Sequence, residues 1–163
     1  METASILSAT KGEKLKDETQ WRTWFSRVRT YAKQKDVWEL CDPDAVTAEV
    51  AAASPESERL TIRPEPRTKP RVPAYPEEGD AEEKRTWRDR MDLFKIEHSN
   101  WQIETKGLND VNDFISTYID PVHYLEVSPL ETPYERLVYL KSRFGETVAY
   151  REEIRMKWRY FST

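Results

Sequence analysis

Prolines divide this chain more sharply than any other residue type. Seven of the ten prolines lie between residues 42 and 80, and five of those fall within residues 63–76. A proline interrupts a regular helix and moves the residue before it toward an extended conformation. Residues 63–76 are therefore predicted to sample polyproline II, inside a proline-rich linker that covers residues 42–80.

Helical periodicity precedes this linker. Trp21, Trp24 and Val28 recur at helical spacing, and Phe25 widens their apolar face. Trp38 extends the same surface into a short second turn. The spacing predicts helical structure over residues 19–41, which the Asp-Pro pair at residues 42–43 ends.

A longer pattern follows the linker, over residues 80–120. Asp80 and Glu83 match a capping box. The next apolar and aromatic residues are spaced by four, three, four and three positions, which puts them on one helical face. They are Trp87, Met91, Phe94, His98 and Trp101. Gly107 is expected to divide the block into two helices, with one bent helix of about 38 residues as the alternative.

The third block starts with Thr132 and Pro133, which are typical of a helix N-terminus. Leu137, Leu140 and Phe144 form its apolar face, and a last helix from about residue 146 would carry Trp158. His123, two residues after Pro121, is assigned to a loop. No alternating strand pattern occurs, so the predicted fold is an all-α bundle of five or six helices.

Residues 1–16 are expected to be a flexible lead and residues 17–163 a single domain that contains the linker. The core is predicted from the aromatic and aliphatic residues on the helical faces. These are Trp21, Trp24, Phe25, Val28, Trp38, Trp87, Met91, Phe94, Trp101, Leu137, Leu140, Phe144 and Trp158.

Composition excludes several classes of function. Apolar residues are 37%, charged residues 34% and the net charge is −4, which argues against a dedicated nucleic-acid binder. One cysteine and two histidines leave little material for a metal site. Neither of the two glycine-rich patterns that bind phosphate groups, GxxxxGK[ST] and GxGxxG, occurs. No apolar run reaches membrane-spanning length. We therefore expect no catalytic residues, cofactor, metal, membrane contact or small-molecule substrate, and a cytoplasmic location.

Two motifs invite a functional interpretation. A pairing of Cys41 with His98 or His123 would suit a thiol hydrolase, but a small residue at a helix end is the preferred interpretation of Cys41. Residues 67–73 match the pattern RxxPxxP, with Arg67, Pro70 and Pro73 as the defining residues. Such a segment is a candidate peptide ligand for an aromatic groove, although a plain linker is preferred.

The arrangement resembles the N-terminal Gag region of copia-type LTR retrotransposons over roughly residues 6–161. Leu15 and the run Trp21-Arg-Thr-Trp24-Phe25 match the family's leucine and aromatic helix start, and Val37-Trp38-Glu-Leu40 matches its tryptophan-containing turn. The proline-rich insertion is similar to fungal Gag-like sequences. A later family segment is matched by Thr132, Glu135, Leu137, Leu140, Lys141, Arg143 and Phe144.

This resemblance implies a structural, non-enzymatic capsid protein whose Gag-like domain self-associates into virus-like particles. The sequence lacks the CCHC zinc knuckle that often follows Gag, so any contact with RNA is expected to be weak. The alternative function is a monomeric helical adaptor, which presents the proline-rich segment to a partner protein.

Overall fold

The computed structural model describes residues 13–53 and 60–145, together with residues 152, 155, 156 and 159. The fold is all-α, as predicted, with six α-helices and no strand in this part of the chain. The helical elements follow one another in this order: η1 (Glu18–Gln20), α2 (Trp21–Gln34), α3 (Trp38–Cys41), α4 (Ala48–Ala53), α5 (Ala81–Thr117), α6 (Pro121–Val127), α7 (Pro133–Leu140) and the π-helical turn η3 (Lys141–Gly145).

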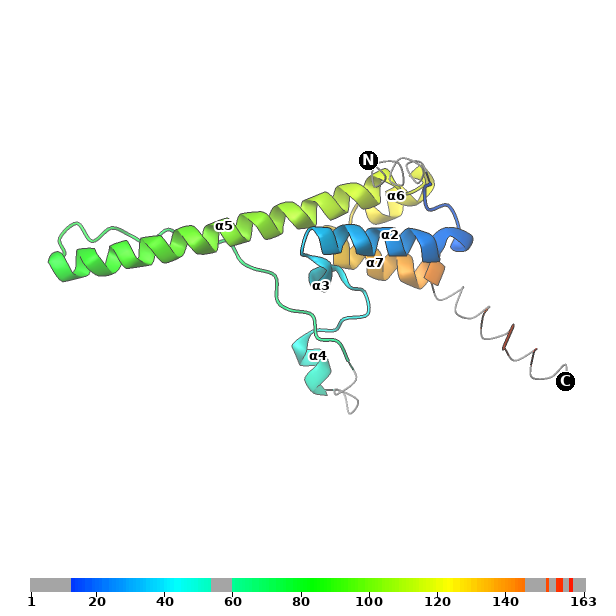
Figure 1. Ribbon diagram of the computed structural model, residues 1–163, viewed down its shortest axis with the longest axis horizontal. Coiled ribbons are helices and arrows are strands. Elements are labelled where there is room, and N and C mark those ends of the chain that lie inside the picture. The colour runs from blue at the N-terminus through cyan, green and yellow to red at the C-terminus, as the bar shows by residue number, and fades with distance from the viewer. Residues whose placement is uncertain (1–12, 54–59, 146–151, 153–154, 157–158, 160–163) are drawn as a thin grey trace.

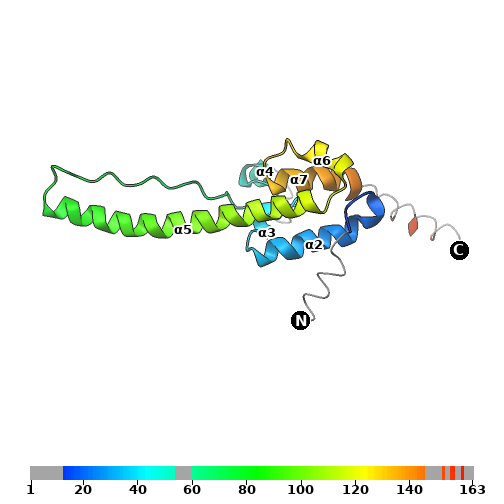
Figure 2. The same ribbon diagram turned by 90° about the horizontal axis from the view of Figure 1, so that it is seen from above.

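The helices form a packed head from which a long arm projects (Figures 1 and 2). The head comprises residues 13–46 and 107–145. The arm comprises residues 63–106: the N-terminal part of α5 and the proline-rich segment that runs back beside it. Helix α5 is therefore shared, because its C-terminal part packs against α2 and α7 while its N-terminal part extends away from them.

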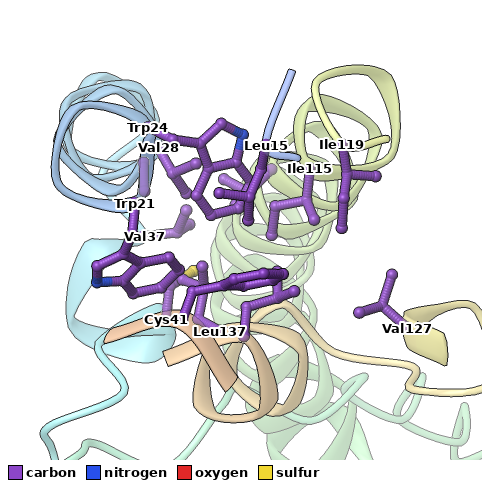
Figure 3. Packing of buried hydrophobic residues seen from close by; sticks show 14 residues of the cluster. Leu15, Trp21, Trp24, Val28, Val37, Cys41, Ile115, Ile119, Val127 and Leu137 are labelled. Carbon is purple, nitrogen blue, oxygen red and sulfur yellow. The ribbon is translucent and has the colours of Figure 1, made fainter. Parts of the chain in front are cut away.

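The core of the head gathers side chains from α2, α3, α5 and α7 (Figure 3). Trp24 is 2% exposed, and its Nε1 donates a hydrogen bond to the Tyr118 carbonyl oxygen at 2.6 Å. The other buried members of the predicted set are Trp21, Val28, Leu137, Leu140 and Phe144. Phe25 and Trp38 are partly buried and pack against this cluster.

Helix α2 ends in a Schellman motif that the sequence analysis did not identify. Asp36 has a φ of 57°, the left-handed conformation that such a motif requires at its first non-helical residue. The amide of Asp36 donates to the Lys33 carbonyl at 3.1 Å, and that of Val37 to the Ala32 carbonyl at 3.0 Å. Because Val37 and Ala32 are both buried, the motif fixes the turn from α2 into α3 against the core.

Helix α5 is continuous over its 37 residues, so the predicted break at Gly107 is wrong and the one-helix alternative is correct. Gly107 is buried where α5 passes the turn between α2 and α3. A Cβ atom there would lie 2.9 Å from Val37 Cγ1 and 3.3 Å from the Lys35 carbonyl oxygen. The glycine therefore permits a close approach between elements. At the other end, Asp80 caps the helix by accepting from the Glu83 amide at 2.9 Å, as predicted.

Helix α6 occupies the segment around His123, for which a loop is predicted, so that prediction is wrong. Asp120 accepts a hydrogen bond from the Val122 amide at 3.0 Å, and Pro121 takes the first helical position. The Asp-Pro pair that ends the α5 pattern thus also begins the next helix. His123 is consequently a helical residue and is buried.

The packed structure begins before residue 17. Leu15, which the sequence analysis placed in the flexible lead, is fully buried, and its amide donates to the Tyr118 carbonyl at 2.9 Å. Residues 1–12 lie outside the described residues, as do Trp158 and most of the predicted C-terminal helix.

Candidate interaction site on the arm

The proline-rich segment packs along α5. Trp87 Nε1 donates to the Pro73 carbonyl oxygen at 3.1 Å, and the Tyr75 ring meets the Trp87 ring edge-on with centroids 4.9 Å apart. Nearer the head, the Arg67 amide donates to Glu104 at 2.9 Å, and the Arg67 guanidinium pairs with the same carboxylate at 3.2 Å. The segment is thus held at both ends of the arm.

Burial along this segment has the period of polyproline II. Pro70, Pro73 and Pro76 are half-buried, whereas the residues between them are exposed. A polyproline II helix has three residues per turn, so these prolines share one face. That face is the one turned toward α5, because the Pro73 carbonyl meets Trp87 there.

The aromatic stripe of α5 supplies the other half of this contact. Its members are half-buried at every position that the sequence periodicity marks: Trp87, Met91, Phe94, His98 and Trp101. The rings of Phe94, His98 and Trp101 follow one another at centroid distances of 5.4 and 5.6 Å, and Lys69 Nζ lies 5.5 Å from the Trp101 ring centroid.

The predicted core assignment of Trp87, Met91, Phe94 and Trp101 is therefore corrected. These residues lie outside the core cluster, on an arm that a single extended segment covers. The helical spacing identified their common face correctly. What covers that face comes from a segment 14 to 37 residues away in the sequence, which periodicity does not reveal.

The residues of the RxxPxxP pattern, Arg67, Pro70 and Pro73, already lie against α5 of their own chain. The proline face of this segment and the Pro73 carbonyl are already engaged by α5, and Arg67 is already paired with Glu104. Binding of this segment to the aromatic groove of another protein would require it to leave α5 first.

The proline-rich segment is attached to the head where it begins, at Arg63. Arg63 Nε donates to the Leu40 carbonyl at 3.1 Å, and its guanidinium lies 4.3 Å from the Tyr134 ring centroid. Tyr134 in turn donates through its hydroxyl to the Ala45 carbonyl at 3.1 Å. The predicted linker therefore contacts the head at Arg63 and contacts α5 along the arm.

The opposite side of the arm carries large apolar side chains that are open to solvent. Leu93, Ile96 and Ile103 are 55%, 61% and 64% exposed. At 3.6 residues per turn, their direction lies roughly 160° around the helix from that of the aromatic stripe. We call Leu93, Ile96 and Ile103 the apolar stripe. The proline-rich segment covers one face of the arm and leaves this one uncovered.

Cys41 lies in the core of the head and is fully buried. Burial raises the pKa of its thiol to about 12, against a smaller opposing effect of the Arg63 charge. Because the thiolate is the nucleophile, this environment opposes reaction at neutral pH. The geometry favours the interpretation of Cys41 as a packing residue.

The two histidines occupy different parts of the molecule. His98 belongs to the aromatic stripe of the arm. His123 lies in the head, where its Nε2 is 2.8 Å from the Lys16 carbonyl oxygen and its ring meets Phe144 edge-on. Since a carbonyl oxygen only accepts, Nε2 must carry the proton. His123 therefore ties α6 to the N-terminal segment.

Arg136 is a structural residue that the sequence analysis missed. It is 9% exposed, and its Nε donates to the Leu130 carbonyl at 2.9 Å while Nη1 donates to Ser116 Oγ at 2.9 Å. These bonds join α7 to α5 and to the loop before α7. Its only sequence signal is the position directly before Leu137, on the buried side of α7.

A second exposed apolar surface lies on α6, where Val122 and Leu125 are 70% and 75% exposed. Across residues 13–53 and 60–145 with the four isolated positions, no group of three or more His, Cys, Asp or Glu side chains could hold a metal ion. The helices of the same part of the chain are too short or too polar for any of them to cross a membrane.

Comparison of the sequence with protein-family models and with curated proteins, and of the structure with solved structures, gave no match.

Proposed function

We propose that this chain is a structural, Gag-like protein of a retrotransposon that self-associates through helical surfaces into a capsid-like shell in the cytoplasm. It acts without catalysis, and its contact with RNA is weak because the net charge of −4 opposes binding to a polyanion. The resemblance of residues 6–161 to copia-type Gag suggests the class. The exposed surfaces of the arm and the head support it.

The observation that carries the proposal is the presence of two separate exposed apolar surfaces. One is the apolar stripe on the arm, and the other is the α6 face of Val122 and Leu125 on the head. A single self-complementary surface closes a dimer, whereas an extended shell needs at least one further contact. Two surfaces on different elements meet this requirement.

The adaptor alternative is less well supported by the geometry. It needs the proline-rich segment as a free ligand, and that segment is hydrogen-bonded and packed along α5. The self-association proposal uses surfaces that are already exposed.

The test is the size of the purified chain over a range of concentrations, by light scattering and by negative-stain electron microscopy. We expect oligomers that grow into particles. Leu93→Glu on the arm and Leu125→Glu on the head should each block particle growth while the circular dichroism spectrum is unchanged.

Val72→Glu is the matched control, because Val72 is 67% exposed and lies on neither surface. It should leave particle growth intact. A wild-type chain that stays strictly monomeric at high protein concentration, at low and at high salt, would contradict the proposal.

A further inference from the structure

The apolar stripe has the spacing of a coiled-coil seam. Leu93, Ile96, Asn100 and Ile103 follow one another at intervals of three, four and three residues, and all four are exposed. Such a spacing places apolar side chains against a partner helix. The stripe therefore has the form of a contact surface for a second helix.

The head restricts how a second copy can approach. Four residues beyond Ile103 the same helical face reaches Gly107, against which Val37 and Lys35 of the head pack. The α2–α3 turn of the head thus lies on the same side of α5 as the stripe. Two arms paired in parallel would bring both heads to the same end and the same side, where they would overlap. Two arms paired antiparallel with Leu93 opposite Ile96 would place the heads at opposite ends, and the first turn of each α5 would have to diverge from the partner helix where the α2–α3 turn packs on Gly107.

Two charges beside the stripe, Arg90 and Glu97, favour the same orientation. Arg90 and Glu97 are exposed, lie one heptad apart on the same edge of the stripe, and have no oppositely charged residue three or four positions away on α5. In an antiparallel pair, residues on this edge of one helix face the same edge of the other. Arg90 of each copy would therefore face Glu97 of the other copy, which gives two such contacts. In a parallel pair, Arg90 would face Arg85, and Glu97 would face Asp92.

We propose that the occupant of the apolar stripe is a second copy of this chain, whose arm pairs antiparallel with the first. The two-fold axis passes between Phe94 and Lys95. Leu93 of each copy packs on Ile96 of the other, and Arg90 pairs with Glu97 on both sides of the axis. The inference rests on the self-association proposed above and specifies one of its contacts.

Charge exchange tests the orientation. Arg90→Glu and Glu97→Arg should each raise the dissociation constant of the dimer about tenfold, because each replaces two attractive contacts by two repulsive ones. The double variant Arg90→Glu/Glu97→Arg should restore wild-type affinity. The measurement is sedimentation equilibrium of the full chain at low salt.

Lys95→Glu is the matched control. It makes the same change of charge on the same helix, at an exposed position between the stripe and the aromatic face, and should leave the dissociation constant near the wild-type value. In a parallel pair, both single variants would bind more tightly, since the introduced carboxylate would face Arg85 and the introduced guanidinium would face Asp92. Tighter binding of the single variants would overturn the proposal, as would an equal effect of the control.

A second measurement separates this inference from the proposed function. Leu93→Glu should abolish the dimer in sedimentation. If particles form while Arg90→Glu and Glu97→Arg change no equilibrium, the arm contact is wrong and the proposed function stands. If the charge exchange behaves as expected but no particles form under any condition, the arm contact stands and the capsid function is wrong.

Discussion

The head and the arm both use tryptophan-rich helical faces, but they bury them to different depths. In the head, Trp21 and Trp24 are covered by several elements and are at most 7% exposed. In the arm, Trp87 and Trp101 are covered by one extended segment and are only half-buried. The same sequence pattern therefore gives a core where several helices converge and a two-element contact where only one segment is available.

The largest difference between the two regions should appear in thiol chemistry. With a pKa of about 12, Cys41 has on the order of one thiolate in ten thousand at pH 8, whereas an ordinary thiol has roughly one in four. We expect native Cys41 to react with iodoacetamide at least ~1000-fold more slowly than a thiol introduced on the arm as Gln102→Cys.

The pH dependence of alkylation separates the two thiols further. The arm thiol should stop accelerating above about pH 9, while the rate of Cys41 should keep rising with pH. Measurement of both rates between pH 7 and 10 by mass spectrometry checks this, and denaturation should make the two alike. Equal rates in the native protein would show that Cys41 is not buried.

Truncation of tryptophans compares the two regions in free energy of unfolding. Trp24→Ala removes a buried ring and its hydrogen bond, and should cost about 3–5 kcal/mol. Trp87→Ala removes a half-buried ring and leaves the Pro73 carbonyl to water, so it should cost only ~1–2 kcal/mol. Urea denaturation followed by circular dichroism measures both.

Hydrogen exchange should locate these two effects. Trp87→Ala should raise exchange within residues 63–79 and leave the head unchanged, because the contact it removes is local to the arm. A melting curve unaffected by Trp24→Ala, or a global loss of protection in Trp87→Ala, would contradict the comparison.

Two arginines offer a smaller contrast. Arg136→Met should cost about 2–3 kcal/mol, because it leaves the partly buried Leu130 carbonyl and Ser116 hydroxyl without their donor. Arg67→Met on the arm removes an ion pair whose arginine side chain is 54% exposed and whose Glu104 side chain is 17% exposed, and it should cost about 0.5–1 kcal/mol. The difference between the two unfolding free energies is the test, and equal costs would show that Arg136 is not held as described.

The smallest effect should be a gain in stability. Asp36→Gly places glycine at the left-handed position of the Schellman motif, where a Cβ atom is unfavourable, and should stabilise the head by ~1 kcal/mol. The same change at Asp89, an exposed position in the arm part of α5, should instead destabilise the protein by about 0.5–1 kcal/mol. Opposite signs of the two changes in thermal unfolding would support the comparison, and a loss at both sites would contradict it.

Local chemistry made the helix starts predictable. Asp80 and Thr132 cap their helices because the side-chain oxygen of each accepts a hydrogen bond from the amide three residues later. The donor and the acceptor of each cap are therefore close together in the sequence. The start of α6 was missed because its Asp-Pro pair was interpreted only as the end of the preceding helix. The same dipeptide performs both roles.

Contacts between distant residues were not predictable from one sequence. The period of α5 shows which residues share a face, but the partner of Trp87 is the carbonyl of a proline 14 residues earlier. Gly107 was interpreted through its poor helix propensity, whereas its structural role is the close approach of Val37. Both errors have one cause. Helical periodicity and helix propensity describe a residue within its own helix, and they do not show which other element packs against it.

Because α5 is continuous through Gly107, it fixes both the distance and the direction of the arm residues relative to the head. Each residue of a helix adds 1.5 Å of length and turns the next side chain by about 100°, so the roughly 39 Å from the tip of the arm to Gly107 carries a fixed angle as well as a fixed distance. An insertion of one residue between the stripe and Gly107 would lengthen the arm little but would rotate the apolar stripe well away from the side on which the α2–α3 turn lies. An insertion of seven residues would restore the direction and change only the reach. The spacing between any two heads joined by their arms is thus set by a count of residues.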